Sequence, residues 1–185
     1  MTLRNAVMAT LLEGEASGYD LAKGFNASVA NFWTATPQQL YRELDRMERE
    51  GLVTARVVRQ DRRPDKRLFS LTDAGHDALR AHLATPLTRP TAIRDGLLVK
   101  VQCADLADPA PVQADLTAHV DWSRAKLARY ERLRERLLAG RTEEEFLAGA
   151  DRVGPYLTLL RGIAFEEENL RWGELALRVL AARSS

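Results

Sequence analysis

Apolar residues recur with the period of an α-helix along the first part of the chain. Val7, Met8, Leu11 and Leu12 form one stripe, which predicts a helix from about residue 3 to residue 12. Two glycines interrupt this pattern, and a second, short helix is predicted to open at Ser17-Gly18-Tyr19-Asp20.

A third helix has a specific start. Thr36-Pro37-Gln38-Gln39 combines a capping residue, a proline at the first helical position and a glutamine that completes a capping box. The helix is predicted to run to Glu50 and to stop at Gly51, with Leu40, Leu44 and Met47 facing inward. The same spacing leaves a polar face that comprises Gln38, Gln39, Arg42, Asp45, Arg46 and Arg49.

From Leu52 the period changes to that of extended chain. Residues 52–58 and 67–72 are rich in β-forming side chains, and the polar segment 59–66 separates them, which predicts a two-stranded hairpin. The hairpin carries more positive than negative charge: Arg56, Arg59, Arg62, Arg63, Lys66 and Arg67 stand against Asp61 and Asp65. A further helix is predicted from Asp73 to Leu83.

Helical periodicity returns after Pro86 and Pro90. A short amphipathic helix begins near Ile93, a long one covers about residues 112–138, a third opens at Thr142, and the last runs from Pro155 to about Ala182. The last helix has two apolar stripes and therefore needs two partners, one of which is expected to be a second copy of the chain. The expected dimer interface comprises Leu116, Val120, Leu127, Leu160, Ile163, Phe165, Leu170, Trp172 and Leu177.

These elements predict a mostly α protein with two domains. Residues 1–85 are expected to form a winged helix-turn-helix with a two-stranded wing, residues 86–92 a linker, and residues 93–185 a helical dimerisation domain. In the winged domain the third helix would enter the major groove, where glutamine pairs with adenine and arginine with guanine or phosphate, while the wing would contact the DNA backbone. By themselves, a solvated helix face and a solvated charged loop explain the same residues.

Composition limits the chemistry. The formal charge of +1 over 185 residues argues against binding nucleic acid by bulk charge, so a DNA surface must be local. The single cysteine, Cys103, the absence of a leader-like opening and the shortness of the apolar runs favour a cytoplasmic protein without a membrane segment.

No catalytic pattern is present in the sequence. The three histidines lack metal-type spacing, and there is neither a glycine-rich phosphate loop nor a nucleophile elbow. We therefore expect no enzyme, no catalytic residue, no metal and no cofactor.

Several motifs resemble one family. Ser17-Gly18-Tyr19-Asp20-Leu21, Thr36 to Leu44, Glu48 to Val53 and Lys66 to Thr72 look like the PadR family of bacterial transcriptional regulators. The segment from Leu159 to Glu166, followed by Leu170-Arg171-Trp172, is similar to the virulence-activator-type C-terminal domain of its longer members. Typical members often carry Tyr-Pro where this chain has Tyr41-Arg42.

The resemblance implies a homodimer that binds double-stranded operator DNA, usually as a repressor, and that small aromatic or lipophilic effectors release in some members. By position, it places Thr36, Gln38, Gln39 and Tyr41 at the DNA-facing start of the third helix, and Arg62, Arg63 and Lys66 in the wing. Together with the residues derived from the helix face and the hairpin, the expected DNA-binding set is Thr36, Gln38, Gln39, Tyr41, Arg42, Arg46, Arg59, Arg62, Arg63 and Lys66.

Three alternatives stay open at this point. The winged domain could bind a protein instead of DNA. An effector could lie between the domains, lined by Phe32, Trp33, Trp122, Tyr130 and Trp172, or these rings could simply hold the domains together. The arginine-rich long helix could form a second binding surface, or it could pack beside the acidic Glu166-Glu167-Glu168 of the last helix, which we favour.

Overall fold

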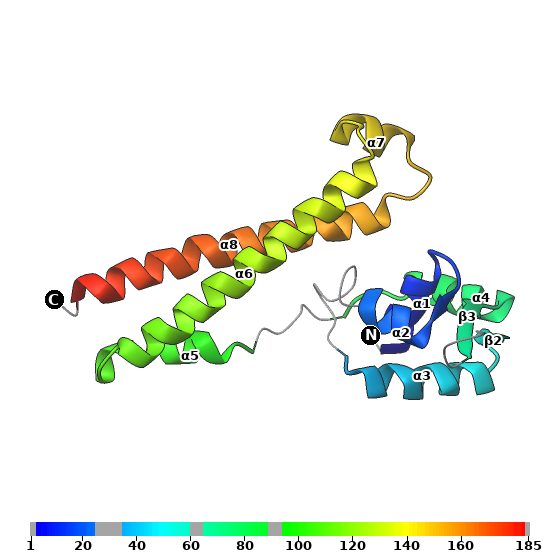
Figure 1. The fold of residues 1–185 in the computed structure, drawn as a ribbon, viewed down its shortest axis with the longest axis horizontal. Coiled ribbons are helices and arrows are strands. Elements are labelled where there is room, and N and C mark those ends of the chain that lie inside the picture. The colour runs from blue at the N-terminus through cyan, green and yellow to red at the C-terminus, as the bar shows by residue number, and fades with distance from the viewer. Residues whose placement is uncertain (1–2, 25–34, 60–64, 89–93, 184–185) are drawn as a thin grey trace. The chain divides into compact units, whose positions relative to one another are not determined.

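The computed structural model describes residues 3–24, 35–59, 65–88 and 94–183 (Figure 1). The chain divides into two compact units, residues 1–89 and 90–185. Helices dominate both units, and a small antiparallel sheet belongs to the first, which confirms the predicted fold class.

The first unit contains four helices and three strands among its described residues. They are α1 (Leu3–Leu11), β1 (Ala16–Ser17), α2 (Gly18–Gly24), α3 (Pro37–Arg49), β2 (Val53–Val58), β3 (Lys66–Leu71) and α4 (Asp73–Leu83). The sheet order is β1-β3-β2, with Ala16 opposite Phe69 and Val53 opposite Leu71. The hairpin of β2 and β3 was predicted, whereas β1 was not, because two residues are too few to show an alternating pattern.

The core of the first unit collects apolar side chains from every element. Leu40, Leu44 and Met47 of α3 are buried as predicted, against Val7 and Met8 of α1. Complete burial of a leucine such as Leu44 contributes about 1.5–3 kcal/mol, and its truncation would cost about 2–5 kcal/mol. The inner face of α3 is thereby fixed, so its outer face has a defined orientation.

Both ends of α3 match the sequence prediction. Thr36 and Gln39 form the capping box, with Pro37 at the first helical position. At the other end Gly51 has a φ of 72°, a left-handed conformation that favours glycine, and the chain turns there into β2. Both ends of α3 are therefore defined by local sequence chemistry.

The second unit is built around two long helices. It contains α5 (Gly96–Gln102), the 3₁₀ helix η2 (Ala104–Leu106), α6 (Ala110–Leu138), α7 (Glu143–Gly149) and α8 (Gly154–Arg183). In Figure 1, α6 and α8 lie side by side and run in opposite directions, with α7 at the end where they are joined. Leu116 and Leu180 pack together in one cluster, and Tyr130, Leu159 and Ile163 pack in another.

A polar contact fixes α7 to both long helices. The Tyr156 hydroxyl of α8 donates to Glu143 of α7 at 2.8 Å, and Arg134 of α6 donates to the Tyr156 oxygen at 3.1 Å and to Glu143 at 2.7 Å. The hydrogen bond from Tyr156, and after it the bond from Arg134, lowers the pKa of the Glu143 carboxyl. Thr142 begins α7 with the predicted capping box, so the end of the helical pair is closed by satisfied polar groups.

Candidate nucleic-acid interface

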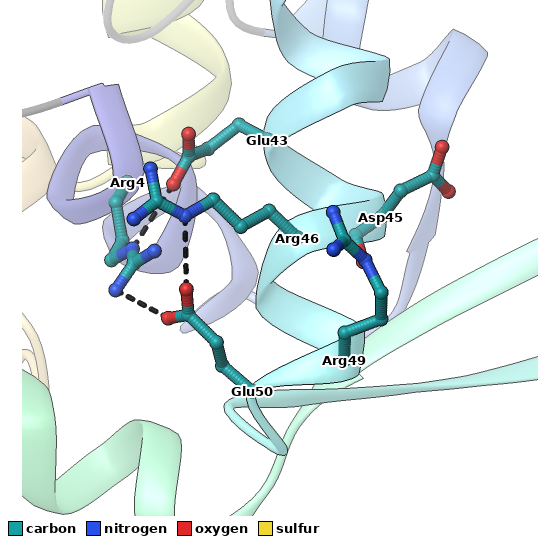
Figure 2. Close-up of polar contacts among 6 residues, drawn as sticks. All are labelled: Arg4, Glu43, Asp45, Arg46, Arg49 and Glu50. Carbon is teal, nitrogen blue, oxygen red and sulfur yellow. Dashed lines mark hydrogen bonds and ion pairs between the residues drawn. The ribbon is translucent and has the colours of Figure 1, made fainter.

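The outer face of α3 is polar and exposed, as the sequence predicted. Gln38, Gln39, Arg42, Asp45, Arg46 and Arg49 are all exposed. Figure 2 shows Asp45 and Arg49 on one side of α3, and Glu43 and Glu50 on the other. The helix thus exposes a stripe of side chains that can form hydrogen bonds. The contacts of these side chains within the protein differ from one position to the next.

Two of the predicted DNA-facing residues are engaged in the helix cap. The Gln39 backbone donates to Thr36 Oγ1 at 3.2 Å, and the Thr36 backbone donates to Gln39 Oε1 at 2.9 Å. Bidentate pairing with adenine needs both the oxygen and the nitrogen of a glutamine amide. The cap holds the Gln39 oxygen toward the Thr36 backbone and takes one of its two lone pairs, which leaves Gln38 as the better residue for reading adenine.

Arg46 lies in an ion-pair chain that joins α1 to α3. Arg4 contacts Glu43 at 3.0 Å and Glu50 at 2.6 Å, and Arg46 donates to the second oxygen of Glu50 at 2.9 Å (Figure 2). The bonds from Arg4 and then Arg46 lower the pKa of Glu50. Arg46, which was expected to contact DNA, is therefore directed along the helix side toward Glu50.

The start of α3 rests against the start of α2. The ring of Tyr41 lies on Gly18, where an added Cβ would come within 2.9 Å of Tyr41 Cδ1. The ring nevertheless remains 45 % exposed. Tyr41 is thus packed against the neighbouring helix while nearly half of its surface stays exposed. The Gly18 contact was not predicted, because no local pattern pairs these two positions.

Carboxylates pair with the cations of the wing. Lys66 contacts Asp20 of α2 at 2.7 Å, and Asp20 also accepts from the Ser17 hydroxyl at 2.8 Å. The Lys66 and Ser17 bonds lower the pKa of Asp20. Arg56 pairs in the same way with Glu15.

Of the remaining predicted wing residues, only Arg59 belongs to the described part of the chain. Arg59 is exposed directly after β2, whereas Arg62 and Arg63 lie outside the described residues. Asp20 was not singled out from the sequence, where nothing relates it to Lys66.

The expected effector residues do not gather within the second unit. Tyr130 is 1 % exposed in the core between α6 and α8, whereas Trp122 is 68 % exposed on α6. Trp172 packs near Leu116 and meets His119 edge-on. Phe32 and Trp33 lie outside the described residues. Tyr130 and Trp172 thus belong to separate packing clusters.

The expected dimer residues divide into two groups. Leu116, Val120 and Ile163 are buried within one chain, in or beside the seam of α6 and α8. Leu127, Leu160, Leu170, Trp172 and Leu177 are half-buried, and Phe165 is 43 % exposed. Further exposed apolar side chains on α8, absent from the expected set, are Leu157, Leu175 and Val179.

Two basic side chains of α6 pair with acidic side chains of α8. Lys126 contacts the buried Glu166 at 3.0 Å, and Arg124 contacts Glu174 of α8 at 3.3 Å. This agrees with packing beside α8, the account favoured for the arginine-rich helix. Within the residues described, no helix is long and apolar enough to cross a membrane, and no group of side chains could hold a metal ion.

The fold of the first unit is a winged helix-turn-helix, in which α2 and α3 precede a hairpin wing. The family model for the transcriptional regulator PadR-like family matches residues 7–81, and the model for the virulence activator alpha C-terminal domain matches residues 93–181. The chain belongs to the PadR-like family of transcriptional regulators, as its motifs indicated. It is accordingly a regulator and not an enzyme.

Similar proteins cover nearly the whole chain. Probable transcriptional regulator Rv1176c of Mycobacterium tuberculosis is 36 % identical over 93 % of this chain and 94 % of its own length. Negative transcriptional regulator PadR of Bacillus subtilis is 27 % identical over 96 % of this chain and 97 % of its own length.

Solved structures show the same architecture. Bacillus subtilis PadR in complex with operator DNA has a TM-score of 0.74 at 26 % identity, over 96 % of this chain and 98 % of that one. The same protein with p-coumaric acid has a TM-score of 0.68, over 97 % of this chain and 98 % of that one. The virulence activator AphA of Vibrio cholerae has a TM-score of 0.68 at 29 % identity, over 98 % and 99 % of the two chains.

Proposed function

We propose that this protein is a DNA-binding transcriptional repressor that acts as a homodimer on operator DNA. The observation that carries the proposal is the outer face of α3, where Gln38 and Arg42 are exposed on a helix whose inner face is buried. Support comes from the similar Bacillus subtilis protein, which is named a negative regulator and is known in complex with operator DNA.

Within this function the interface residues have two roles. Gln38 and Arg42 contact base edges, since their side chains are free of the helix cap and of the Glu50 ion pairs. Thr36, Gln39 and Tyr41 approach the DNA at the start of α3. Arg46 contacts the DNA from the side of the helix. Lys66, Arg59, Arg62 and Arg63 of the wing contact phosphates, which fix the register without reading sequence.

The dimer is formed by the second unit. Phe165 and Val179 lie on an exposed apolar face of α8, which would remain in water in a single chain. Two recognition helices then contact half-sites about one helical turn apart, roughly 34–36 Å, or a multiple of that distance.

An effector controls this dimer in the proposed function. The Bacillus subtilis protein has been solved with p-coumaric acid, a small phenolic acid, and this chain has aromatic side chains in both units. Trp122, which is 68 % exposed on α6, is the proposed contact from the second unit, whereas Tyr130 is enclosed between α6 and α8 and Trp172 packs near Leu116. A ligand that favours one spacing of the recognition helices would shift the dimer between binding and non-binding states.

The proposed place of action is the cytoplasm, where the DNA of a bacterium is reached. The similar proteins named above are bacterial regulators. A regulator of transcription must reach the chromosome, so a cytoplasmic protein is the simplest arrangement.

Selection from a pool of random duplexes, followed by gel shifts at two salt concentrations, tests the function. A phosphate-binding dimer must enrich a symmetric sequence and must lose affinity steeply as salt rises. Enrichment of no sequence, with no retarded band at low salt, would instead identify a protein-interaction module.

A further inference from the structure

Asp45 is an exception on the outer face of α3. The other residues of that face, Gln38, Gln39, Arg42, Arg46 and Arg49, are neutral or positively charged. A carboxylate there faces a polyanion when the helix enters the groove, and like charges repel. The side chain is 58 % exposed on the same side of the helix as Arg49 (Figure 2).

The Asp45 side chain is held in place from the wing. Arg67 of β3 donates to Asp45 Oδ1 at 3.3 Å, and its other terminal nitrogen contacts Glu48 at 2.5 Å. The guanidinium also lies over the Phe69 ring, 5.0 Å from its centroid. Phe69 is buried, so Arg67 is supported by the core of the domain as well as by α3.

The chemistry of a carboxylate in the major groove is specific. Cytosine presents an amino donor at N4, and aspartate or glutamate accepts from it. A carboxylate has two oxygens and about four lone-pair sites, so one bond from Arg67 leaves Asp45 able to accept another. Adenine also presents an amino donor at N6, but its N7 acceptor lies beside that donor and repels a carboxylate, whereas guanine and thymine present only acceptors and would leave the carboxylate unpaired.

We propose that Asp45 is a specificity-determining residue that accepts a hydrogen bond from the amino group of a cytosine in the operator. Arg67 is its positioning residue. This inference rests on the proposed function, because it needs α3 to enter the major groove. It explains why an acidic side chain occupies a surface that otherwise suits DNA: the charge penalises every site at which no amino group meets it.

The sharpest test replaces Asp45 by asparagine, which keeps the shape of the side chain and removes the charge. Asparagine pairs with adenine N6 and N7, so selection from random duplexes should show cytosine replaced by adenine at one position of each half-site. Asp45→Ala should show no preference at that position. For both variants, affinity for a scrambled duplex should rise, and the ratio of operator to scrambled affinity should fall by about tenfold.

The matched control is Asp77→Asn on α4, which makes the same change of charge at an exposed aspartate that pairs with Arg80. It should leave the selected sequence unchanged. Arg67→Gln should weaken the cytosine preference without abolishing it, and circular dichroism would show that each variant is folded.

The outcomes separate this inference from the function on which it rests. A wild-type chain that enriches no sequence would remove the proposed function. A wild-type chain that enriches an operator, with Asp45→Asn enriching the same one, would overturn the role of Asp45 alone. Equal rises in affinity for operator and scrambled duplex would show that Asp45 only repels phosphates.

Discussion

Tyr41 of α3 packs directly on Gly18, the first residue of α2. The two residues lie at the junction of the helices that form the helix-turn-helix, and a side chain on Gly18 would displace the Tyr41 ring. The ring therefore takes its position from the neighbouring helix, and the glycine matters there for its small size, not for a left-handed backbone conformation.

Gly18→Ala should displace the Tyr41 ring and weaken operator binding several-fold in gel shifts. The methyl group would overlap the ring edge, so the ring must rotate or the two helices must separate. In a Tyr41→Ala background the same change should have little further effect, because the overlapping atoms are gone. Gly149→Ala, at a site with open space around it, is the control. Equal losses in both backgrounds would contradict the coupling.

Substitutions of base-contacting and of phosphate-contacting residues should change DNA binding in different ways. Gln38→Ala or Arg42→Ala should cost about 1–3 kcal/mol of operator binding and relax the preference at one base position. Lys66→Ala should weaken all duplexes alike and reduce the slope of affinity against salt by about one. Asp20→Asn, which frees Lys66 from its ion pair, should strengthen binding to all duplexes. Identical behaviour of Arg42 and Lys66 variants would show that the roles are wrongly assigned.

Phe165→Glu should convert the proposed dimer to a single chain, measured by light scattering at micromolar concentration. A charge at this exposed position costs little in a monomer, but it would be buried without a partner in an interface. Leu147→Glu, an equally drastic change at an exposed position on α7, should leave the dimer intact. A dimer that survives Phe165→Glu and Val179→Glu together would place the interface elsewhere.

Two buried tyrosine hydroxyls of the second unit should contribute unequally to stability. The Tyr156 hydroxyl bonds to Glu143 and Arg134, so Tyr156→Phe should lower the free energy of unfolding by about 1–3 kcal/mol. The Tyr130 hydroxyl is buried with no hydrogen-bond partner among the described residues, so Tyr130→Phe should be neutral or stabilising. Urea unfolding of the two variants measures the difference, and a larger loss at Tyr130 would contradict it.

The ion pairs of Glu50 should stabilise the first unit at neutral pH and be lost in acid. Arg4 and then Arg46 hold the folded-state pKa of Glu50 below its ordinary value, so the stabilisation is present above that ordinary value. It is lost as the pH falls through the lowered folded-state pKa. Arg4→Met removes the principal partner, and an NMR titration should show the Glu50 pKa moving back toward its ordinary value. An unchanged titration would mean that Arg4 does not control Glu50 in solution.

Much of the fold could be predicted because its elements are defined by local rules. The capping boxes at Thr36 and Thr142, the apolar stripe of Leu40, Leu44 and Met47, and the helix from Asp73 to Leu83 are all read from neighbouring residues. The inner and outer faces of α3 follow from the same periodicity. The candidate DNA surface therefore follows from the spacing of residues along α3.

The sequence by itself determined the order of the main helices and of the hairpin, the outer face of α3 and the family, since these depend on residue type and spacing along the chain. The tertiary structure alone decided the contacts of Tyr41 with Gly18, Lys66 with Asp20, and Asp45 with Arg67. It also buried Tyr130 between α6 and α8. Each of these contacts joins residues that lie far apart in the sequence. Such pairs become neighbours only when a core fixes the distances between elements, and no local periodicity encodes those distances.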